Sequence, residues 1–292
     1  MLNTVSNSIF SNIAEYGIAI DIGTTTIAMQ LIELGTMRMI DSYTALNSQR
    51  LYGADVIRRI NAANHGKGEQ LQKMVCNDLQ QGIHTLLEKN HILMEQLRKI
   101  VIAGNTTMIH LLRQLSCETL GVYPFMPVTL ERFKCQMKIS EGKSGQIEVT
   151  TELGQKELGI SEPYDTELNV EATILPGIST YIGGDIVAGL MACGFDQTEE
   201  IALFVDLGTN GEMAIGNQNR ILCTSTAAGP AFEGGNISCG TGGIAGAVCG
   251  VTIHDGICEI QTINNQEPVG ICGSGLTDAV SELLNAGVID DT

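Results

Sequence analysis

Two copies of one short pattern constrain this sequence most strongly: an apolar run, an Asp-x-Gly-Thr turn and a second apolar run. The first copy spans residues 17–34 around Asp21–Thr26 (DIGTTT), and the second spans 201–215 around Asp206–Glu212 (DLGTNGE). Each copy predicts a β-hairpin with a polar, glycine-bearing turn. Because about one domain length separates the copies in a chain of 292 residues, the repeat predicts two lobes of duplicated architecture.

Strand and helix patterns alternate along the rest of the chain, which is typical of an α/β protein. Apolar residues at helical spacing predict a helix with one buried stripe over 70–90, and helical order returns at 184–192. A short buried strand is expected at 100–103. A further apolar stripe over 276–286 predicts a last helix, which Gly287 is placed to end.

These patterns divide the chain into three parts. We expect a polar tail at 1–16, a first lobe at 17–195 and a second lobe at 196–292. Within the first lobe, residues 134–171 are charged and rich in turns with weak periodicity, so we expect an irregular insertion there.

The charge balance excludes several classes of partner. Lys and Arg number 16 against 33 Asp and Glu, a net charge of −17, which opposes binding to nucleic acid or to an anionic membrane surface. Glycine is enriched, with 34 residues, so glycines mark places where backbones or ligands approach closely. An anionic ligand must therefore be held by backbone dipoles, hydroxyl groups and a metal ion.

Location and cysteine usage point to a reducing compartment. No window approaches the roughly 18 consecutive apolar residues of a membrane span, and residues 1–16 contain no Lys, no Arg and no apolar run. The nine cysteines lack the short spacings of zinc or iron–sulfur sites. We therefore expect a cytoplasmic protein whose thiols are mostly buried small apolar groups.

The residue types of the two turns suit a nucleotide. A carboxylate at the end of a buried strand holds Mg²⁺ directly or through water, and a glycine lets backbone N–H groups approach a phosphate. Opposed turns of this kind would clamp a triphosphate. The alternatives remain open for single motifs: an isolated DIGTT is equally a tight hairpin turn, and Gly270–Leu276 (GICGSGL) alone is weaker evidence, because such turns commonly serve only close packing.

The order of DIGTTT, GNTTM, DLGTNGE and GICGSGL resembles the actin, sugar kinase and Hsp70 superfamily. The strings LYGADVIRRINAAN, VIAGNTTMIHLL, LGVYPFMPV, STAAGPAFEGGNISCG and GICGSGLTDAVSELL are similar, more narrowly, to the ATPase domain of the reductive activators of corrinoid proteins. The resemblance extends over residues 17–290. It implies an α/β fold of two duplicated RNase H-like lobes with a nucleotide cleft between them.

The resemblance also implies an activity and partners. Such an ATPase uses Mg²⁺ and ATP to help drive the one-electron reduction of cob(II)alamin to cob(I)alamin in a corrinoid methyl-transfer protein. The corrinoid protein would be the main partner, and related activators suggest a homodimer. Two other hypotheses stay open: a small-molecule kinase of the same superfamily, and a noncatalytic docking module latched by nucleotide.

Site residues follow motif by motif. The motifs place at the nucleotide Asp21, Gly23, Thr24, Thr25, Asn105, Thr106, Gly208, Thr209, Asn210, Gly211, Gly270, Gly273, Ser274 and Gly275. Asp21 and Asp206 are the expected metal ligands, and Asp206 is also expected to be catalytic. Asp185 would position water or Mg²⁺ unless it is only a helix N-cap, and Glu212 would orient a water unless it is an ordinary acid at a strand end.

Two departures from the family pattern lead to further expectations. Activators of this kind carry an iron–sulfur segment, usually N-terminal, whereas about sixteen polar residues precede the motifs here. We therefore expect no iron–sulfur cluster in this chain, and an electron donor that acts through a missing segment. The family domain also continues beyond the helix at 276–286, so the second lobe is expected to be incomplete at its C-terminal end.

Overall fold

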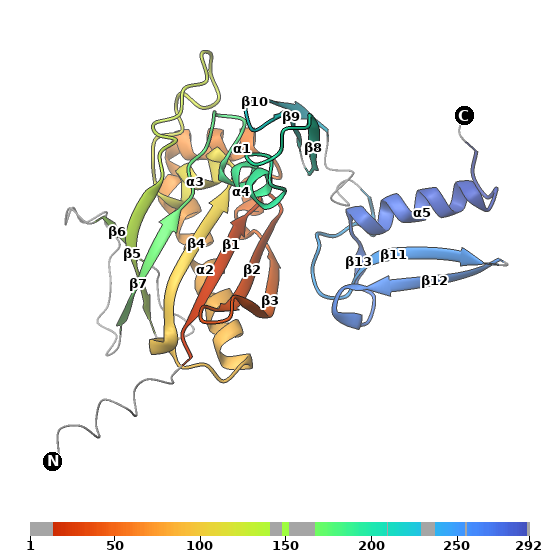
Figure 1. Ribbon diagram of the computed structural model, residues 1–292, viewed down its shortest axis with the longest axis horizontal. Helices are drawn as coiled ribbons and strands as arrows, with labels where there is room; N and C mark the ends of the chain where they lie inside the picture. Colours follow the sequence, from red (N-terminus) through yellow and green to blue (C-terminus); the bar gives the residue numbers. More distant parts are fainter. Residues whose placement is uncertain are drawn as a thin grey trace.

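The computed structural model describes residues 14–140, 148–151, 167–208, 210–228, 237–254 and 256–290. Figure 1 shows these elements coloured along the chain. The strands of the first part of the chain are β1 (Tyr16–Ile22), β2 (Thr26–Glu33), β3 (Arg38–Leu46), β4 (Leu97–Gly104), β5 (Phe133–Ser140), β6 (Glu148–Thr151) and β7 (Glu167–Ile174). The later strands are β8 (Ala202–Leu207), β9 (Asn210–Asn217), β10 (Arg220–Ala227), β11 (Ala247–His254), β12 (Ile257–Thr262) and β13 (Gly270–Ile271).

Five α-helices and several short helical turns join the strands of the described chain. The α-helices are α1 (Val56–Ala62), α2 (Gly68–Lys89), α3 (Thr106–Leu112), α4 (Gly184–Ala192) and α5 (Gly273–Asn285). The shorter turns are η1 (Ser48–Leu51), η2 (Ala63–Lys67), η3 (Met94–Gln96) and η5 (Ile263–Asn265). No helix in these described stretches has the length and apolarity needed to cross a lipid bilayer.

The first lobe is built on a seven-stranded sheet in the order β3-β2-β1-β4-β7-β5-β6. β1, β2 and β3 form an antiparallel meander, and β4 and β7 continue the sheet parallel to β1. Ile18, Ile20 and Ile22 of β1 are buried at a spacing of two residues, the pattern of a strand with one face in the core. The hairpin predicted around DIGTTT is therefore confirmed.

Helix α2 covers this sheet and supplies much of the core. It spans Gly68–Lys89, close to the predicted 70–90, and buries Leu71, Val75, Leu79 and Ile83 on one stripe. These side chains lie four residues apart, about one helical turn, so one side of the helix faces the sheet. The predicted amphipathic helix is confirmed.

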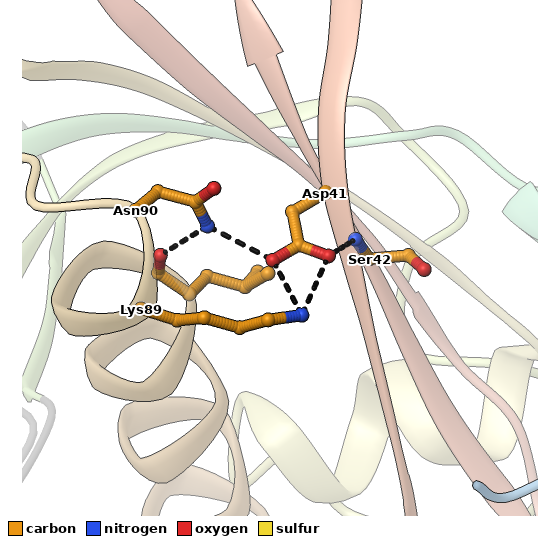
Figure 2. A network of polar contacts seen from close by, with 5 residues as sticks. Asp41, Ser42, Lys89 and Asn90 are labelled. Atoms are coloured by element: carbon orange, nitrogen blue, oxygen red, sulfur yellow. Dashed lines mark hydrogen bonds and ion pairs between the residues drawn. The ribbon is translucent and has the colours of Figure 1, made fainter. Parts of the chain in front are cut away.

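A polar network fixes the end of α2 to strand β3 (Figure 2). The Asp41 carboxylate accepts hydrogen bonds from Lys89 Nζ at 3.1 Å, from Asn90 Nδ2 at 3.0 Å and from the Ser42 backbone N–H at 2.9 Å. Burial alone would raise the pKa of Asp41, but these hydrogen bonds and the Lys89 charge outweigh it and hold the pKa below its usual value. The network sets where the helix ends against the sheet.

The expectation of an irregular insertion over 134–171 is wrong for the residues that the structure describes. They form β5, β6 and β7 of the main sheet, with β5 antiparallel to β7. Cys135, Met137 and Ile139 of β5 are buried, whereas the residues between them are exposed or half-buried. This alternation is the signature of a strand, and the interleaved lysines hid it. Residues 141–147 and 152–166 of the expected insertion lie outside the described residues.

The second Asp-x-Gly-Thr pattern also forms an antiparallel meander, β8-β9-β10. One of its faces packs against α4 through a small core of Ile182, Ile186, Leu190, Phe195 and Ala214. Strand and helix approach closely, because a Cβ added to Gly189 of α4 would lie 2.7 Å from Cζ of Phe204 in β8. The opposite face is apolar and exposed in the described structure at Leu203, Val205, Leu207, Ile215 and Leu222.

A third, three-stranded sheet has the order β12-β11-β13, and α5 packs along β11 (Figure 1). The helix spans Gly273–Asn285, and Gly287 follows it with a φ of 66°, a conformation that suits glycine. The last helix and its glycine stop were therefore predicted correctly. All nine cysteines of the chain are free thiols.

The fold makes the core under α2 the main source of stability. We expect Leu79→Ala to lower the free energy of unfolding by about 2–5 kcal/mol, because the Leu79 side chain is 0% exposed and its removal leaves a cavity. Leu51→Ala is the matched control: that leucine is 79% exposed, and its truncation should change stability by less than about 0.5 kcal/mol. Urea unfolding followed by circular dichroism measures both, and equal effects would contradict the described packing.

Candidate functional site

Hydrogen bonds from two later segments, at Asn47 and Arg59, hold the carbonyl groups of the turn between β1 and β2. The Gly23 N–H donates to the Thr26 carbonyl at 3.0 Å and closes the turn. Asn47 then donates from its side chain to the Gly23 carbonyl at 2.9 Å and from its backbone to the Thr25 carbonyl at 2.9 Å. The Thr24 carbonyl accepts from Nη2 of Arg59. Three successive carbonyls of the turn are thus bonded to the protein interior.

This arrangement fixes the direction of the turn's amides. In a trans peptide the C=O and the N–H point in opposite directions. Because Asn47 binds the Gly23 carbonyl and Arg59 binds the Thr24 carbonyl, the N–H groups of Thr24 and Thr25 point away from those side chains. Successive amides aimed to one side form a concavity that suits an anion. The turn therefore has the geometry expected of a phosphate-binding loop.

The GNTTM segment lies beside this turn. Asn105 is the N-cap of α3, where its Oδ1 accepts from the Met108 N–H at 2.9 Å, and its Nδ2 donates to Oγ1 of Thr24 at 3.0 Å. Thr106 is buried, and its hydroxyl donates to the Ser179 carbonyl at 2.7 Å. Asn105 therefore contacts the predicted phosphate turn, whereas the described hydrogen bond of Thr106 fixes the loop that precedes α4.

Carboxylates from both lobes act on one another at this position. Asp21 lies near the end of β1 and Asp206 near the end of β8, directly opposite Glu212 of β9 in the strand register. Partial desolvation raises the pKa of Asp21, and the negative charge of Asp206 raises it further. Partial desolvation likewise raises the pKa of Asp206. Such coupling requires proximity, so the two Asp-x-Gly-Thr turns lie near each other.

Asp185 has the most displaced pKa of this group. It lies in the first turn of α4, and burial raises its pKa to about 7. The backbone N–H of Ile186, which donates to Oδ1 at 2.8 Å, lowers the pKa in part, whereas the charges of Asp21, Glu212 and Asp206 raise it. The N-cap of α4 is Gly183, so Asp185 is not the N-cap. A carboxyl group with a pKa near 7 in a group of acids is typical of a functional site.

The second turn is ordered by its own strands. The Gly208 N–H donates to the Asn210 carbonyl at 2.8 Å, and Gly211 pairs with Thr226 of β10. Burial raises the pKa of Glu212, the Ser225 hydroxyl lowers it by donating at 3.0 Å, and the charge of Asp206 raises it again. Thr209, expected at the nucleotide, lies outside the described residues.

The acids suit a divalent cation in part. Asp21, Asp185, Asp206 and Glu212 repel one another when ionised, and a cation among them would relieve that repulsion. In the described ranges, no three His, Cys, Asp or Glu side chains are grouped so that they hold a metal ion by themselves. Mg²⁺ commonly binds through one or two carboxylates together with water and substrate phosphates. The residues present fit that mode and do not form an all-protein metal cage.

The glycines expected at adenosine have close packing as their described role. A Cβ on Gly270 would lie 2.8 Å from the Cys239 carbonyl oxygen, and one on Gly275 would lie 2.1 Å from that of Val248. Gly273 begins α5 and accepts a hydrogen bond from Thr277, while the Ser274 hydroxyl lies 3.2 Å from the Cys272 thiol. A nucleotide contact of these four residues stays a prediction.

One segment near the first turn was missed by sequence reasoning. A Cβ on Gly242 would lie 2.8 Å from Oγ1 of Thr26 and 3.7 Å from Cγ2 of Thr25. The same segment is bonded to β13, because the Thr241 N–H donates to the Ile271 carbonyl at 2.9 Å. The chain from Gly240 to Gly243 therefore links the third sheet to the phosphate turn, and the sequence signal was the run Gly-Thr-Gly-Gly.

Two side chains that position the turn were also missed. Arg59 stands in the string LYGADVIRRINAAN, to which no role was assigned, and a lone Asn47 carries no motif. Both are fully buried. The available signal was an arginine within an otherwise amphipathic segment; its burial, which for an Arg requires partners, is visible only in the structure.

Comparison with known proteins assigns the family. Residues 16–155 match the family model described as RACo middle region, and residues 200–292 match the one described as C-terminal domain of RACo, the ASKHA domain. The chain belongs to the RACo family. The predicted resemblance to reductive activators of corrinoid proteins is confirmed.

Named relatives of the RACo family agree with this assignment. The chain is 32% identical over 277 residues to "Corrinoid activation enzyme RamQ" of Eubacterium limosum, a match that covers 94% of this chain and 42% of that protein. It is 26% identical over 299 residues to "[Co(II) methylated amine-specific corrinoid protein] reductase" of Methanosarcina barkeri, with 94% and 52% covered. The chain thus spans about half the length, or less, of these relatives.

A solved structure supports the fold. The "Reductive activator for corrinoid,iron-sulfur protein" is 31% identical and superposes with a TM-score of 0.76, over 95% of this chain and 41% of that one. The predicted α/β fold of the actin, sugar kinase and Hsp70 type is therefore confirmed. Its hairpins repeat as expected, although the described strands of the second lobe are divided between two small sheets.

The raised pKa of Asp185 predicts a pH-dependent stability. An acid whose pKa is about 7 in the folded state and near 4 when unfolded keeps its proton longer when folded, so stability is lost as pH rises from about 4 to 7. We expect Asp185→Asn, which cannot ionise, to be as stable as the parent near pH 4 and more stable at pH 8. The midpoint of urea unfolding, measured across this pH range with a chelator present to remove divalent cations, tests the prediction.

Asp196→Asn is the matched control for that series. It removes one carboxylate from an exposed position just beyond the end of α4 and so reproduces the change in net charge. A parent and an Asp185→Asn variant whose stabilities stay parallel from pH 4 to pH 8 would contradict the assigned pKa.

Proposed function

We propose that this chain binds and hydrolyses Mg²⁺-ATP as part of a reductive activator that helps drive the one-electron reduction of cob(II)alamin to cob(I)alamin in a corrinoid protein. The names of these relatives support the corrinoid partner. The observation that carries the proposal is the convergence of Asp21, Asp185 and Asp206, from two lobes, on a turn whose amides face one way.

Binding of the phosphate chain would begin at the first turn. The N–H groups of Thr24 and Thr25 point away from Asn47 and Arg59 and would donate to phosphate oxygens. The Thr24 side chain is oriented by the hydrogen bond from Asn105 at 3.0 Å. These donors carry no formal charge, so most of the negative charge of the phosphate chain stays uncompensated.

Mg²⁺, bound near Asp21 and Asp206, would supply that compensation and stabilise charge that develops on the phosphoryl oxygens. The two carboxylates sit on separate lobes, so each alone gives an incomplete site. Burial raises the pKa of both groups, and the negative charge of Asp206 adds to the rise for Asp21, so holding both as carboxylates is unfavourable without a cation. Binding of the metal–nucleotide complex would therefore favour approach of the lobes.

Hydrolysis requires a water molecule placed in line with the γ-phosphoryl group. Asp185, with a pKa of about 7, is suited to accept the proton that this water loses on attack at phosphorus, because a general base works best with a pKa near the working pH. The products are ADP and phosphate, and the proton passes to Asp185 and then to solvent. Glu212 stays hydrogen-bonded to Ser225. Its negative charge would help to keep the pKa of Asp185 raised.

Coupling to the corrinoid would follow from lobe movement. Positioning and electrostatic stabilisation supply most of the catalysis in phosphoryl transfer. Closure of both lobes around ATP would move the β8-β9-β10 meander relative to the first lobe. That movement would alter how the corrinoid protein is bound. The single electron that converts cob(II) to cob(I) would come from a donor acting through an iron–sulfur segment outside the residues of this chain. A cytoplasmic setting fits this chemistry.

Asp206→Asn tests the proposed hydrolysis. We expect ATP turnover to fall by on the order of 100-fold or more, as when other electrostatic groups of transition-state stabilisation are removed, because the variant keeps the shape of Asp206 and loses its charge. Phosphate release in the presence of Mg²⁺ is the measurement, with circular dichroism to verify the fold.

Glu199→Gln serves as the control, since Glu199 is an exposed acid ahead of β8 and its loss makes the net charge one unit less negative, as Asp206→Asn does. Unchanged hydrolysis in Asp206→Asn would remove the assignment of Asp206. A parent protein that fails to hydrolyse ATP in the presence of Mg²⁺ would remove the proposed activity itself.

A further inference from the structure

Gly242 is a buried glycine that packs against the first sheet. A Cβ at this position would lie 2.8 Å from Oγ1 of Thr26 and 2.9 Å from Cδ2 of Leu46. Carbon atoms in ordinary contact lie about 3.5 Å apart or more, so no side chain fits here without movement. The φ angle of Gly242 lies outside the left-handed region, so the backbone conformation does not require a glycine. Lack of space explains this glycine.

The two side chains that face Gly242 flank the phosphate turn. Thr26 and Leu46 are partners in the register of β2 and β3. The Thr26 carbonyl accepts the hydrogen bond from the Gly23 N–H that closes the turn, at 3.0 Å. Leu46 directly precedes Asn47, whose side chain donates to the Gly23 carbonyl. Gly242 therefore packs over the pair of residues in β2 and β3 that lies nearest to the turn.

The chain just before Gly242 is fixed to the segment GICGSGL, which we predict to bind adenosine. The Thr241 N–H donates to the Ile271 carbonyl at 2.9 Å, and the Ile271 N–H donates to the Cys239 carbonyl at 2.8 Å. Ile271 belongs to β13 and directly precedes Cys272, the N-cap of α5. Backbone hydrogen bonds on both sides of Ile271 therefore hold the start of α5 to this chain.

The two predicted subsites are thus joined through adjacent residues. Gly242 contacts the first sheet beside the phosphate turn, and Thr241 is bonded to the strand that leads into α5. In Figure 1 the third sheet lies beside β3, the edge strand of the first sheet. Because no side chain fits at this contact, the glycine sets how closely the third sheet approaches the turn. A ligand that bridges both subsites depends on that spacing, whereas a smaller ligand in one subsite does not.

We infer that Gly242 is a positioning residue for the nucleotide, because its small size sets the distance between the phosphate turn and the adenosine segment at β13 and α5. This inference rests on the proposed nucleotide function and deepens it by naming what brings the two subsites into register. At the correct spacing, binding of one end of the nucleotide raises the effective concentration of the other end at its own subsite. A displaced subsite loses this gain even when its own residues are intact.

The test compares ADP with its two parts, pyrophosphate and adenosine, in Gly242→Ala. Each dissociation constant is measured with Mg²⁺ by displacement of a fluorescent ADP analogue, after direct titration of that analogue with each variant. We expect the constant of ADP to rise about tenfold or more, whereas those of pyrophosphate and adenosine change less than about threefold. A variant with less folded protein would change all three constants by one common factor. The ratio of the ADP constant to that of each part is therefore the readout.

The next residue supplies a matched control. Apart from its chain neighbours, the nearest atom to a Cβ on Gly243 would be Cδ1 of Ile263, at 3.9 Å, and the φ angle of Gly243 also lies outside the left-handed region. Gly243→Ala therefore makes the same chemical change one position along the chain without a steric conflict. We expect its three dissociation constants to equal those of the parent protein.

Two variants at Leu46 extend the test. Leu46→Phe enlarges the side chain that faces the glycine and leaves Gly242 unchanged, so it should cause the same selective loss of ADP affinity and keeps the test decisive if Gly242→Ala does not fold. Leu46→Ala, combined with Gly242→Ala, removes the Cδ2 atom that the new Cβ would meet at 2.9 Å. We expect this double variant to recover part of the ADP affinity, because one of the two close contacts is relieved.

Each result supports or overturns the inference. An unchanged ADP constant in both Gly242→Ala and Leu46→Phe, or a change of all three constants by one common factor, overturns it and leaves the proposed ATPase standing if the parent hydrolyses ATP. Failure of pyrophosphate or adenosine to displace the analogue from the parent also overturns it, since the site then lacks two separable parts. A parent that binds neither ADP nor ATP overturns both proposals. A selective loss of ADP affinity in these two variants, and not in Gly243→Ala, supports the inference.

Discussion

The inward orientation of the first turn's carbonyls is the constraint on which the rest of the site depends. Asn47 and Arg59 bind the carbonyls of Gly23 and Thr24 from below, and planar peptides then leave the following amides no other direction. The turn itself supplies only short polar residues and a glycine. The orientation of its amides comes from Asn47, the N-cap of η1, and from Arg59 of α1, so the geometry of a local motif depends on packing against distant residues.

The second constraint is electrostatic. Strand ends from both lobes and the start of α4 bring several carboxylates together, and burial with mutual repulsion raises their pKa values. Such an arrangement is unfavourable without a counter-charge. In the proposed function, a cation bound together with its own anionic ligand would relieve this repulsion, and occupancy of the site would then be linked to the relative position of the lobes.

Much of this could be read from the sequence, and the failures have physical causes. Hairpins and amphipathic helices follow from local periodicity, which is why both Asp-x-Gly-Thr hairpins and α2 were predicted. Strand β5 shows the same period of two, but the lysines at Lys134 and Lys138 disguised it as a surface loop. The roles of Arg59 and Gly242 depend on contacts with residues more than 30 positions away. Their local signals, an arginine in an amphipathic segment and a Gly-Thr-Gly-Gly run, do not say which residues they contact.

Helix α4 contacts both lobes. Its first residues pack on the first lobe, where a Cβ on Gly184 would lie 3.1 Å from Leu175, and its middle packs on β8 at Phe204. The surroundings of Asp185, in the first turn of α4, therefore depend on how the β8-β9-β10 meander lies against the first lobe. Because the charges of Glu212 and Asp206 raise the pKa of Asp185, that pKa would fall if the meander moved away from the first lobe.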